Sequence, residues 1–394
     1  LKQDWLHAGR AVCHHSKRRA AAHMAPIKRG GTVAVTGATG YVGGWIVQAL
    51  LDRGYRVRGC VRDADHVRAA FLRSMPGHAS SRLTLHSCDL RVPGACDDAF
   101  RGCHGVVHAA ADPDLPLEQR VEVYQEVSRC VIAGVARSGS VTRVVFTSSA
   151  AAIAGDQDLE EYKLRPVIDE DRYPNLENPS NKPLEAIGYT LGKIESERLF
   201  QRAAEASGGG WDVVITNPAD NLGPLLSRHH AEAREVWTPW HCRLARLLEG
   251  GDVPQAPLHQ PWWPVDVRDT AEAHVRLLES GAAVAGGRYF LSSGRAVRPE
   301  DLGRLCAEVL PEACLIPSMA PGGERPEGPG KPQGPEAAAQ AVWDACRLCN
   351  DKICRDVGMT FRPLEDTLRD CVESLLALSA LTPRRGGEAG RPGP

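Results

Sequence analysis

Three evenly spaced glycines, Gly37, Gly40 and Gly43, lie in the stretch VTGATGYVGGW. A β-branched run, TVAVT, precedes them and an amphipathic run, 42–52, follows, so the glycines fall where a strand turns into a helix. The amino end of a helix presents unpaired N–H groups and a partial positive charge, and glycine keeps side chains away from them. This context predicts a site for the pyrophosphate of a dinucleotide, whereas isolated glycines are typical of a tight turn.

A tyrosine and a lysine, Tyr189 and Lys193, are spaced i and i+4 in the run IGYTLGKIESERLF, which places both on one face of a helix. Alone, this spacing is more typical of a surface tyrosine beside a solvated lysine. Upstream, however, a β-branched run ends in TSSA, and the ligand crevice of an open parallel sheet lies outside the carboxyl ends of its strands. The order of strand and helix therefore indicates that the reaction chemistry lies here.

The elements that must position these residues follow an alternating pattern. Short β-branched runs at 32–36, 56–61, 83–88, 105–110 and 143–149 alternate with helical runs at 42–52, 67–73, 95–101 and 118–137. This alternation predicts an α/β fold, namely a Rossmann-type doubly wound parallel sheet with a smaller C-terminal substrate lobe. We expect residues 30–221 to form the nucleotide-binding domain with the catalytic residues, and 222–380 to form the lobe, with some return to the main sheet.

The two ends and one internal segment differ in composition from the rest. Residues 1–29 are basic, which indicates a disordered extension or an organelle-targeting segment. Residues 317–340 alternate proline with glycine and charge, so we expect a flexible surface insertion there, with helical periodicity resuming at 364–378. Residues 381–394 are expected to be a disordered tail. The predicted location is the cytoplasm, with organelle targeting as the alternative.

Composition narrows the function classes. The chain has 394 residues and a net charge of −2, which argues against a nucleic-acid partner, and no apolar run is long enough to span a bilayer. Its 13 cysteines lack regular spacing and are expected to be reduced thiols. Cys346, Cys349 and Cys354 come nearest to a metal pattern, but no second ligand pair accompanies them, so no metal is expected. The oligomeric state cannot be inferred.

The choice of cofactor depends on the residues after the second and third strands. In such folds an acidic residue after the second strand binds the ribose 2′-hydroxyl of NAD, whereas an arginine meets the 2′-phosphate of NADP. Arg62 comes first here and Asp63 follows it, an order that favours NADPH; NAD is the alternative if Arg62 is only a solvated charge. Asp89 is placed to meet the adenine amino group or, equally, to cap its own loop.

Together, several motifs resemble the extended short-chain dehydrogenase/reductases of the dihydroflavonol reductase and cinnamoyl-CoA reductase type. They are VTGATGYVGGW, VRD after the second strand, CDL at 88–90, VVHAA at 106–110, FTSSA at 146–150, YTLGK, NPADNLGP at 217–224, WPVDVRDTAEAHVRLLE at 263–279 and FRPLEDTLRDCVESL near the end. The resemblance covers roughly residues 31–378. It implies an NAD(P)-dependent enzyme that acts on a small-molecule carbonyl group.

The resemblance assigns roles to individual residues. Ser149 would hold the substrate carbonyl, Tyr189 would be the general acid, and Lys193 would bind the nicotinamide ribose and lower the pKa of the tyrosine toward neutrality. We choose Ser149 over Ser148 because adjacent strand residues point in opposite directions and Ser149 precedes Ala150. The expected cofactor contacts are Gly37, Thr39, Gly40, Tyr41, Val42, Gly43, Arg62, Asp89, Leu90, Ala109, Ala110, Tyr189, Lys193 and Pro218.

Departures from the family pattern leave the substrate open. Small apolar residues at 150–153 replace the polar residue that reaches a flavonoid, and LEAIGYTLGK differs from the segment typical of thioester reductases. Asp220 is an unusual charge that contacts substrate or caps its turn. Besides an NADPH-dependent ketone or aldehyde reductase, two alternatives remain: an NAD-dependent nucleotide-sugar epimerase or dehydratase, for which Arg295, Arg298 and Arg304 offer some basic character, and a catalytically silent NAD(P)-binding regulator.

Overall fold

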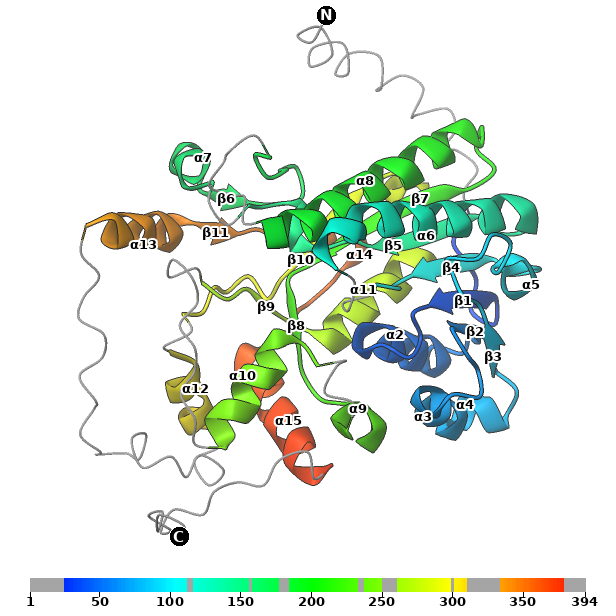
Figure 1. Cartoon of the computed structure of the whole chain (residues 1–394), viewed down its shortest axis with the longest axis horizontal. Helices are drawn as coiled ribbons and strands as arrows, with labels where there is room; N and C mark the ends of the chain where they lie inside the picture. Colours follow the sequence, from blue (N-terminus) through cyan, green and yellow to red (C-terminus); the bar gives the residue numbers. More distant parts are fainter. Residues whose placement is uncertain are drawn as a thin grey trace, which may run out of the picture.

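The centre of the molecule is a seven-stranded sheet in the order β10-β7-β5-β4-β1-β2-β3 (Figure 1). The computed structural model describes residues 25–111, 116–155, 158–176, 184–232, 237–249, 261–298, 301–309 and 334–378. All neighbouring strands in this sheet are parallel. The strands are β1 (Thr32–Thr36), β2 (Arg56–Val61), β3 (Leu83–Ser87), β4 (Gly105–His108), β5 (Arg143–Thr147), β7 (Asp212–Pro218) and β10 (Arg288–Leu291). The predicted Rossmann-type fold is confirmed.

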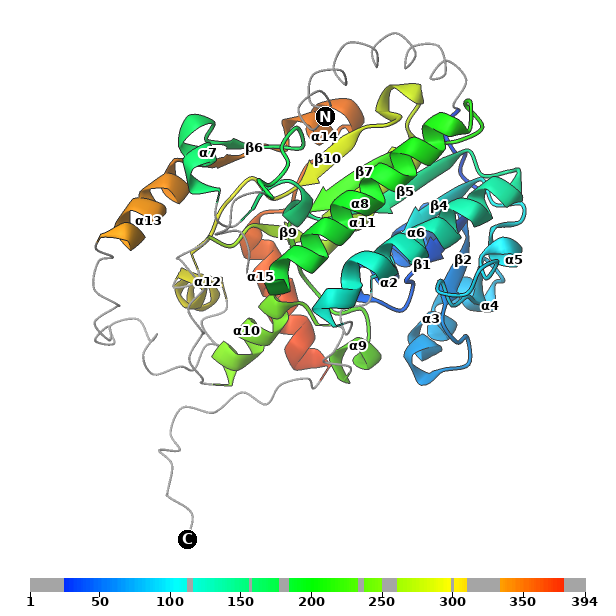
Figure 2. The ribbon, with the colours of Figure 1, turned by 45° about the horizontal axis from the view of Figure 1, so that its top comes forward.

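Helices cover both faces of this sheet (Figure 2). On one face α6 (Leu117–Ser138) packs beside α8 (Leu184–Ala206), and on the other α2 (Tyr41–Asp52) packs beside α11 (Val267–Glu279). Val33 and Val35 of β1 belong to the apolar cluster that includes α2 and α11, whereas Ala34 belongs to the cluster under α6 and α8. Successive strand residues point to opposite faces, so the uninterrupted apolar run of β1 suits a strand that is buried on both.

Shorter elements connect the layers. They are η2 (Val67–Ala69), α3 (Ala70–Ser74), α4 (Pro76–Ala79), α5 (Asp97–Phe100), η3 (Ala150–Ala152), η7 (Ala282–Val284) and α14 (Asp351–Val357). The strand order reverses beside β1, because β2 and β3 follow on one side while β4 and the later strands follow on the other. At such a switch point the loops after adjacent strands separate and leave a crevice at the carboxyl ends of β1 and β4.

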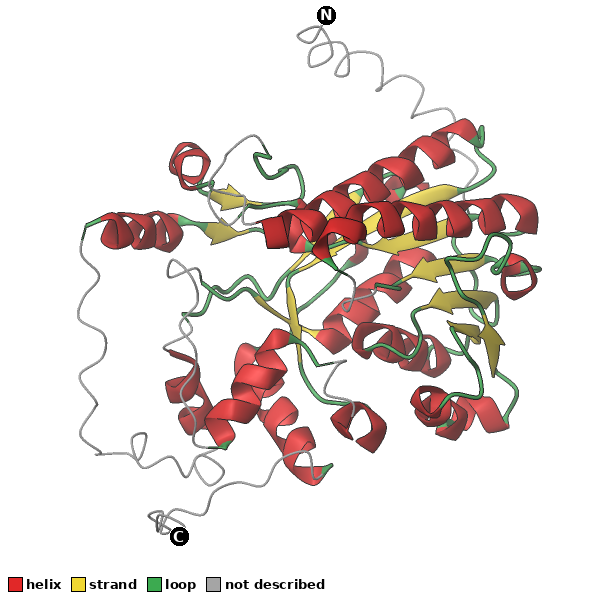
Figure 3. Ribbon diagram, viewed as in Figure 1, coloured by secondary structure: helices red, strands yellow, loops and turns green. Residues whose placement is uncertain are grey.

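A second lobe continues from the carboxyl end of β7 (Figure 3). Its elements are β8 (Asp220–Leu222), α9 (Arg228–Glu232), α10 (Pro239–Leu248), β9 (Pro264–Asp266), α12 (Leu302–Val309) and α15 (Leu364–Ala377). Leu244, Leu302 and Leu368 from three of these helices share one apolar cluster, and the rings of Trp240 and Trp262 stack at 4.3 Å. The helix expected at 364–378 is therefore present and packs into a core of this lobe.

A small parallel pair of strands, β6 (Val167–Ile168) and β11 (Arg347–Leu348), lies between α7 (Leu159–Leu164) and α13 (Pro335–Ala345). The prediction of a flexible insertion up to residue 340 is wrong for its last part, because α13 begins at Pro335 after Gly334. Proline is well suited to the first turn of a helix. Trp343 anchors this helix by packing against Tyr162 and Trp263. Residues 317–333 lie outside the described residues.

The described chain begins inside the segment that was expected to be disordered. Ile27 is buried, and its N–H donates to the Leu278 carbonyl at 3.0 Å while its carbonyl accepts the hydroxyl of Tyr55 at 2.8 Å. The prediction for 1–29 is therefore wrong for residues near Ile27, because an apolar side chain there completes the core. Residues 1–24 and 379–394 lie outside the described part. Within it, no helix has the length and apolar character needed to cross a membrane.

Candidate functional site

Ser149, Tyr189 and Lys193 come together at the carboxyl end of β5. Ser149 is the second residue after β5 and caps the turn η3, and the other two residues lie on α8, which packs against η3. The Ser149 hydroxyl lies beside the phenol of Tyr189 and lowers its pKa. The ammonium of Lys193 donates to the carbonyl of Thr147, the last residue of β5, at 2.9 Å. A serine hydroxyl, a phenol and an ammonium therefore converge where the fold forms its crevice.

Burial dominates the electrostatics of this group. It lowers the pKa of Lys193 from 10.5 to about 8, and the carboxylate of Glu197 acts in the opposite direction. Burial also raises the pKa of Tyr189, while Ser149 lowers it. The expectation that Lys193 brings this pKa toward neutrality is not met, because the ammonium points at the Thr147 carbonyl rather than at the phenol. A raised pKa keeps the phenol protonated at neutral pH, the form that a general acid requires.

The two neighbouring serines have different partners. Ser148 is buried, and its hydroxyl donates to Glu197 Oε1. The hydroxyl oxygen of Ser149 accepts the N–H of Ala151 at 3.2 Å and lies beside Tyr189. Ser148 thus faces Glu197 and Ser149 faces Tyr189, and both of these partners lie on α8.

The glycine turn forms a narrow cradle between β1 and α2. Gly37 has a φ of 71°, and a Cβ on it would lie 2.7 Å from Cα of Ala110, in the loop after β4. A Cβ on Gly43 would lie 2.1 Å from the carbonyl oxygen of Gly37, so glycine is required there for the helix to approach the turn. Gly40 is the N-cap of α2 and supplies no side-chain cap, and the first turn contains no acidic residue. These features fit a bound pyrophosphate.

The adenosine end of the predicted site is formed by the loops after β2 and β3. Arg62 is exposed just beyond the end of β2. Asp63 uses Oδ1 to accept the N–H of Asp65 at 2.9 Å, so this carboxylate caps its own loop. Asp89 does the same after β3, because its Oδ1 accepts the N–H of Arg91 at 3.1 Å. Oδ1 of Asp89 therefore caps its own loop, as one of the two interpretations of this residue predicted.

The other predicted cofactor contacts lie around the crevice, with one exception. Thr39, Val42, Leu90, Ala109 and Ala110 are half-buried beside the turns after β1, β3 and β4, and Pro218 ends β7. The exception is Tyr41, whose phenol points into the core of the second lobe, with its ring edge against His241 at 4.7 Å. A side-chain contact of Tyr41 with the cofactor is thus not supported, because α2 turns this residue away from the crevice.

Several residues around the site were not anticipated. Tyr124 of α6 faces both the ring of Tyr189, at 6.1 Å, and the ammonium of Lys193, at 5.6 Å. Glu197 and Asn217 lie behind the serines and are fully buried. A sequence signal existed for Glu197, because it is spaced i+4 from Lys193 and shares its helix face. Asp220 is exposed, raises the pKa of Tyr189, and accepts the N–H of Trp263 at 3.4 Å.

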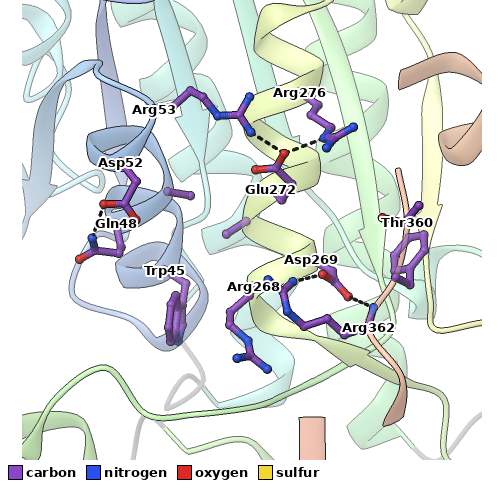
Figure 4. Close-up of a pocket in the computed structure, with 13 residues that line it drawn as sticks. Trp45, Gln48, Asp52, Arg53, Arg268, Asp269, Glu272, Arg276, Thr360 and Arg362 are labelled. Atoms are coloured by element: carbon purple, nitrogen blue, oxygen red, sulfur yellow. Dashed lines mark hydrogen bonds and ion pairs between the residues drawn. The ribbon is translucent and has the colours of Figure 1, made fainter. Parts of the chain in front are cut away.

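A separate pocket of about 590 Å³ lies between α2, α11 and the segment before α15 (Figure 4). Glu272 pairs with Arg53 and Arg276, and Asp269 pairs with Arg362. Ser149, Tyr189 and Lys193 do not line it. Because none of these three residues reaches it, we do not assign this pocket to the candidate site. In the described ranges, no cluster of His, Cys, Asp or Glu is placed to hold a metal ion.

Comparisons with known proteins identify a family and several reductases that are similar in sequence. The sequence profile of the NAD dependent epimerase/dehydratase family matches residues 33–291. Cinnamoyl-CoA reductase 1 of Arabidopsis thaliana is 34% identical over 355 residues, covering 90% of this chain and 92% of that protein. Dihydroflavonol 4-reductase of Zea mays is 31% identical over 369 residues, with coverage of 91% and 92%.

Two solved structures are similar in fold. Vestitone reductase from alfalfa has a TM-score of 0.66 and 26% identity, and the match covers 89% of this chain and 100% of that one. Yeast methylglyoxal/isovaleraldehyde reductase Gre2, complexed with NADPH, has a TM-score of 0.68 and 21% identity, with coverage of 88% and 99%.

Proposed function

Because the chain belongs to the NAD dependent epimerase/dehydratase family and is an NAD(P)-dependent oxidoreductase of the extended short-chain dehydrogenase/reductase type, we propose that it reduces a ketone or an aldehyde of a small molecule with NADPH. The observation that carries this proposal is the convergence of Ser149, Tyr189 and Lys193 at the end of β5. The reductase names of the relatives support the same class of reaction.

In the proposed reaction the three residues have separate tasks. Ser149 donates a hydrogen bond to the substrate carbonyl oxygen and orients it toward Tyr189. Tyr189, kept protonated by its raised pKa, gives its proton to that oxygen. When bound, the nicotinamide supplies the hydride to the carbonyl carbon. Lys193 offsets the negative charge that develops on the phenol and donates to the ribose hydroxyls. The transfer of one hydride and one proton gives an alcohol and the oxidised cofactor.

The choice of NADPH rests on the loop after β2. An exposed arginine follows the strand, at the position where such folds meet the 2′-substituent of the ribose. The acid that would bind a 2′-hydroxyl, Asp63, already accepts a backbone N–H of its own loop. Arg62 therefore holds the 2′-phosphate in this proposal, and NADPH binds more tightly than NADH.

The epimerase alternative was favoured in the sequence by a group of three arginines near residue 300, and the structure does not leave them free to bind a second diphosphate. Arg295 pairs with Glu365, Arg298 pairs with Asp344, and Arg304 pairs with two acids of α12 and its approach. Each of these arginines is thus neutralised locally instead of being gathered into a site for a second diphosphate.

The test is a fluorescence titration of the purified protein with NADPH and separately with NADH, followed by turnover with two aldehydes, methylglyoxal and isovaleraldehyde. The proposal expects at least about tenfold tighter binding of NADPH, because Arg62 makes a charge-assisted contact with the phosphate, and loss of NADPH absorbance when an aldehyde is added. Tightly held NAD that exchanges with neither nucleotide would contradict the proposal and favour an epimerase.

A further inference from the structure

Glu197 of α8 is a carboxylate with no exposure to solvent, one helical turn after Lys193. Its Oε1 accepts hydrogen bonds from Ser148 Oγ at 2.5 Å and from Asn217 Nδ2 at 2.8 Å. Its Oε2 lies 2.9 Å from Nε of Arg288, whose side chain is only 8% exposed. A buried carboxylate is costly unless donors and a positive charge compensate it. Here two donors serve Oε1, and the guanidinium charge of Arg288 lies beside Oε2.

These donors connect the helix to the turn that carries the catalytic serine. Asn217 lies near the end of β7 and also donates to the carbonyl of Ser149, at 3.0 Å. Arg288 of β10 also donates to the carbonyl of Ala152, at 2.9 Å, and Ala152 ends the turn η3 after Ser149. Through these contacts Glu197 links α8, with its tyrosine and lysine, to both ends of the segment that positions the serine.

We propose that Glu197 is a positioning residue that fixes Ser149 relative to Tyr189 and maintains the charge of Lys193. This inference rests on the proposed function, because it assumes that these three residues form the catalytic set. A carboxylate is suited to the position because its Oε1 accepts hydrogen bonds from two donors, Ser148 and Asn217, while its negative charge faces the guanidinium of Arg288. A glutamine would turn an amide donor toward one of them and would leave the guanidinium of Arg288 without its counter-charge.

The effect on Lys193 follows from the groups that face its ammonium. These are the rings of Tyr124 on α6, Phe146 on β5 and Tyr189 on α8, the carbonyl of Thr147, the imidazole of His108 on β4, and the carboxylate of Glu197. Burial lowers the pKa of His108 to about 3, so it is neutral. Within this set Glu197 provides the negative charge, and it raises the pKa of Lys193 against the effect of burial.

The test compares Glu197→Gln with a matched control, Asp212→Asn. Asp212 is also a buried carboxylate paired with an arginine, Arg143, and that arginine likewise donates to backbone carbonyls. This pair lies at the amino end of β5, four residues and about 13 Å along the strand from Thr147. Both variants remove one charge of a buried pair, so general destabilisation affects both, while only Glu197→Gln reaches the catalytic set.

We expect Glu197→Gln to lower kcat for isovaleraldehyde by about tenfold to a hundredfold relative to Asp212→Asn, because Ser149 loses its fixed position. At about pH 6.5, where Lys193 is charged in both proteins, NADPH should bind with a Kd within about threefold of the wild type. As the pH rises, NADPH affinity should weaken at a lower pH in Glu197→Gln, because the pKa of Lys193 has fallen. Nucleotide fluorescence, measured without turnover, gives the midpoint of this transition, that is, the pH at which half of the NADPH affinity is lost.

An equal loss of kcat in both variants, or an unmoved midpoint of NADPH affinity, would overturn the inference. If Glu197→Gln does not fold, Ser148→Ala removes one donor and keeps the carboxylate; kcat should then fall about threefold to tenfold with unchanged NADPH affinity, and an unchanged kcat would be the contrary result. Failure of the proposed function is distinguishable, because the wild type itself would then not consume NADPH when an aldehyde is added, whatever Glu197→Gln does.

Discussion

Replacing Lys193 with methionine should make the protein more stable at neutral pH while removing its activity. Lys193 is almost fully buried, and burial lowers its pKa from 10.5 to about 8. Below pH 8 the lysine is charged in both the folded and the unfolded chain, so the folded state carries the full cost of burying the charge. Methionine fills a similar volume without a charge, and its unbranched chain suits the space between the aromatic rings.

The magnitude follows from the two pKa values. The lowering from 10.5 to about 8 corresponds to about 3 kcal/mol in the free energy of unfolding. The variant also loses the hydrogen bond to the Thr147 carbonyl, which costs about 1 kcal/mol. We therefore expect Lys193→Met to be more stable than the wild type by about 2 kcal/mol at about pH 7.

The sign of the pH dependence is specific. Between pH 8 and 10.5 the unfolded chain binds a proton that the folded chain has lost, so the stability of the wild type rises with pH over this range. The advantage of Lys193→Met should therefore shrink, and above pH 10.5 the variant should be less stable by about 1 kcal/mol because only the lost hydrogen bond remains.

Urea denaturation of the wild type and Lys193→Met at several pH values between about 7 and 11 measures the two unfolding free energies. Lys163→Met is the control, because Lys163 is an exposed lysine of α7 and its replacement should leave the difference near zero at every pH. A difference for Lys193→Met that stays constant from pH 7 to 11 would refute the reasoning that burial of the charge lowers the pKa of this lysine.

The remaining predictions concern the cofactor. Arg62→Ala should raise the Kd for NADPH by about tenfold to a hundredfold and change that for NADH by less than about threefold, because only NADPH carries the 2′-phosphate; equal losses in the two fluorescence titrations would contradict this role. Gly43→Ala should lower both thermal stability and NADPH affinity, because its Cβ would lie 2.1 Å from the Gly37 carbonyl oxygen. Gly40→Ala, with its nearest contact at 3.3 Å, should weaken NADPH binding but leave the melting temperature nearly unchanged.

The main sheet could be predicted from the sequence because its signals are local. The central strands β1, β4, β5 and β7 are short, largely apolar runs buried on both faces, and the glycine turn identifies the first crossover. The helix α13 could not be predicted in the same way, because its first residues belong to a stretch rich in proline and glycine. Its place is determined by Trp343, whose packing partners Tyr162 and Trp263 are distant in sequence.

The proposed catalytic residues also had a local signal, the i,i+4 spacing of Tyr189 and Lys193 after a strand that is followed by two serines. The contact between the residues that support them had no local signal in the sequence, because Glu197 meets Arg288 only through the pairing of β10 with β7. The side-chain direction of Tyr41 could not be predicted either. The glycine motif specifies where α2 begins, but not that the side chain of Tyr41, the first residue of α2, packs into the second lobe. Burial, which sets the pKa values of Tyr189 and Lys193, is a property of the folded chain alone.

The most direct test of the central claim is a comparison of Tyr189→Phe with the wild type. Turnover of an aldehyde that the wild type reduces is followed by loss of NADPH absorbance, and NADPH affinity is measured by fluorescence. The account predicts a fall in kcat of at least about a hundredfold, because the proton donor is gone, with a Kd for NADPH that stays within about threefold. A Tyr189→Phe variant that keeps full turnover would show that the proton reaches the carbonyl oxygen from another group and would contradict the account.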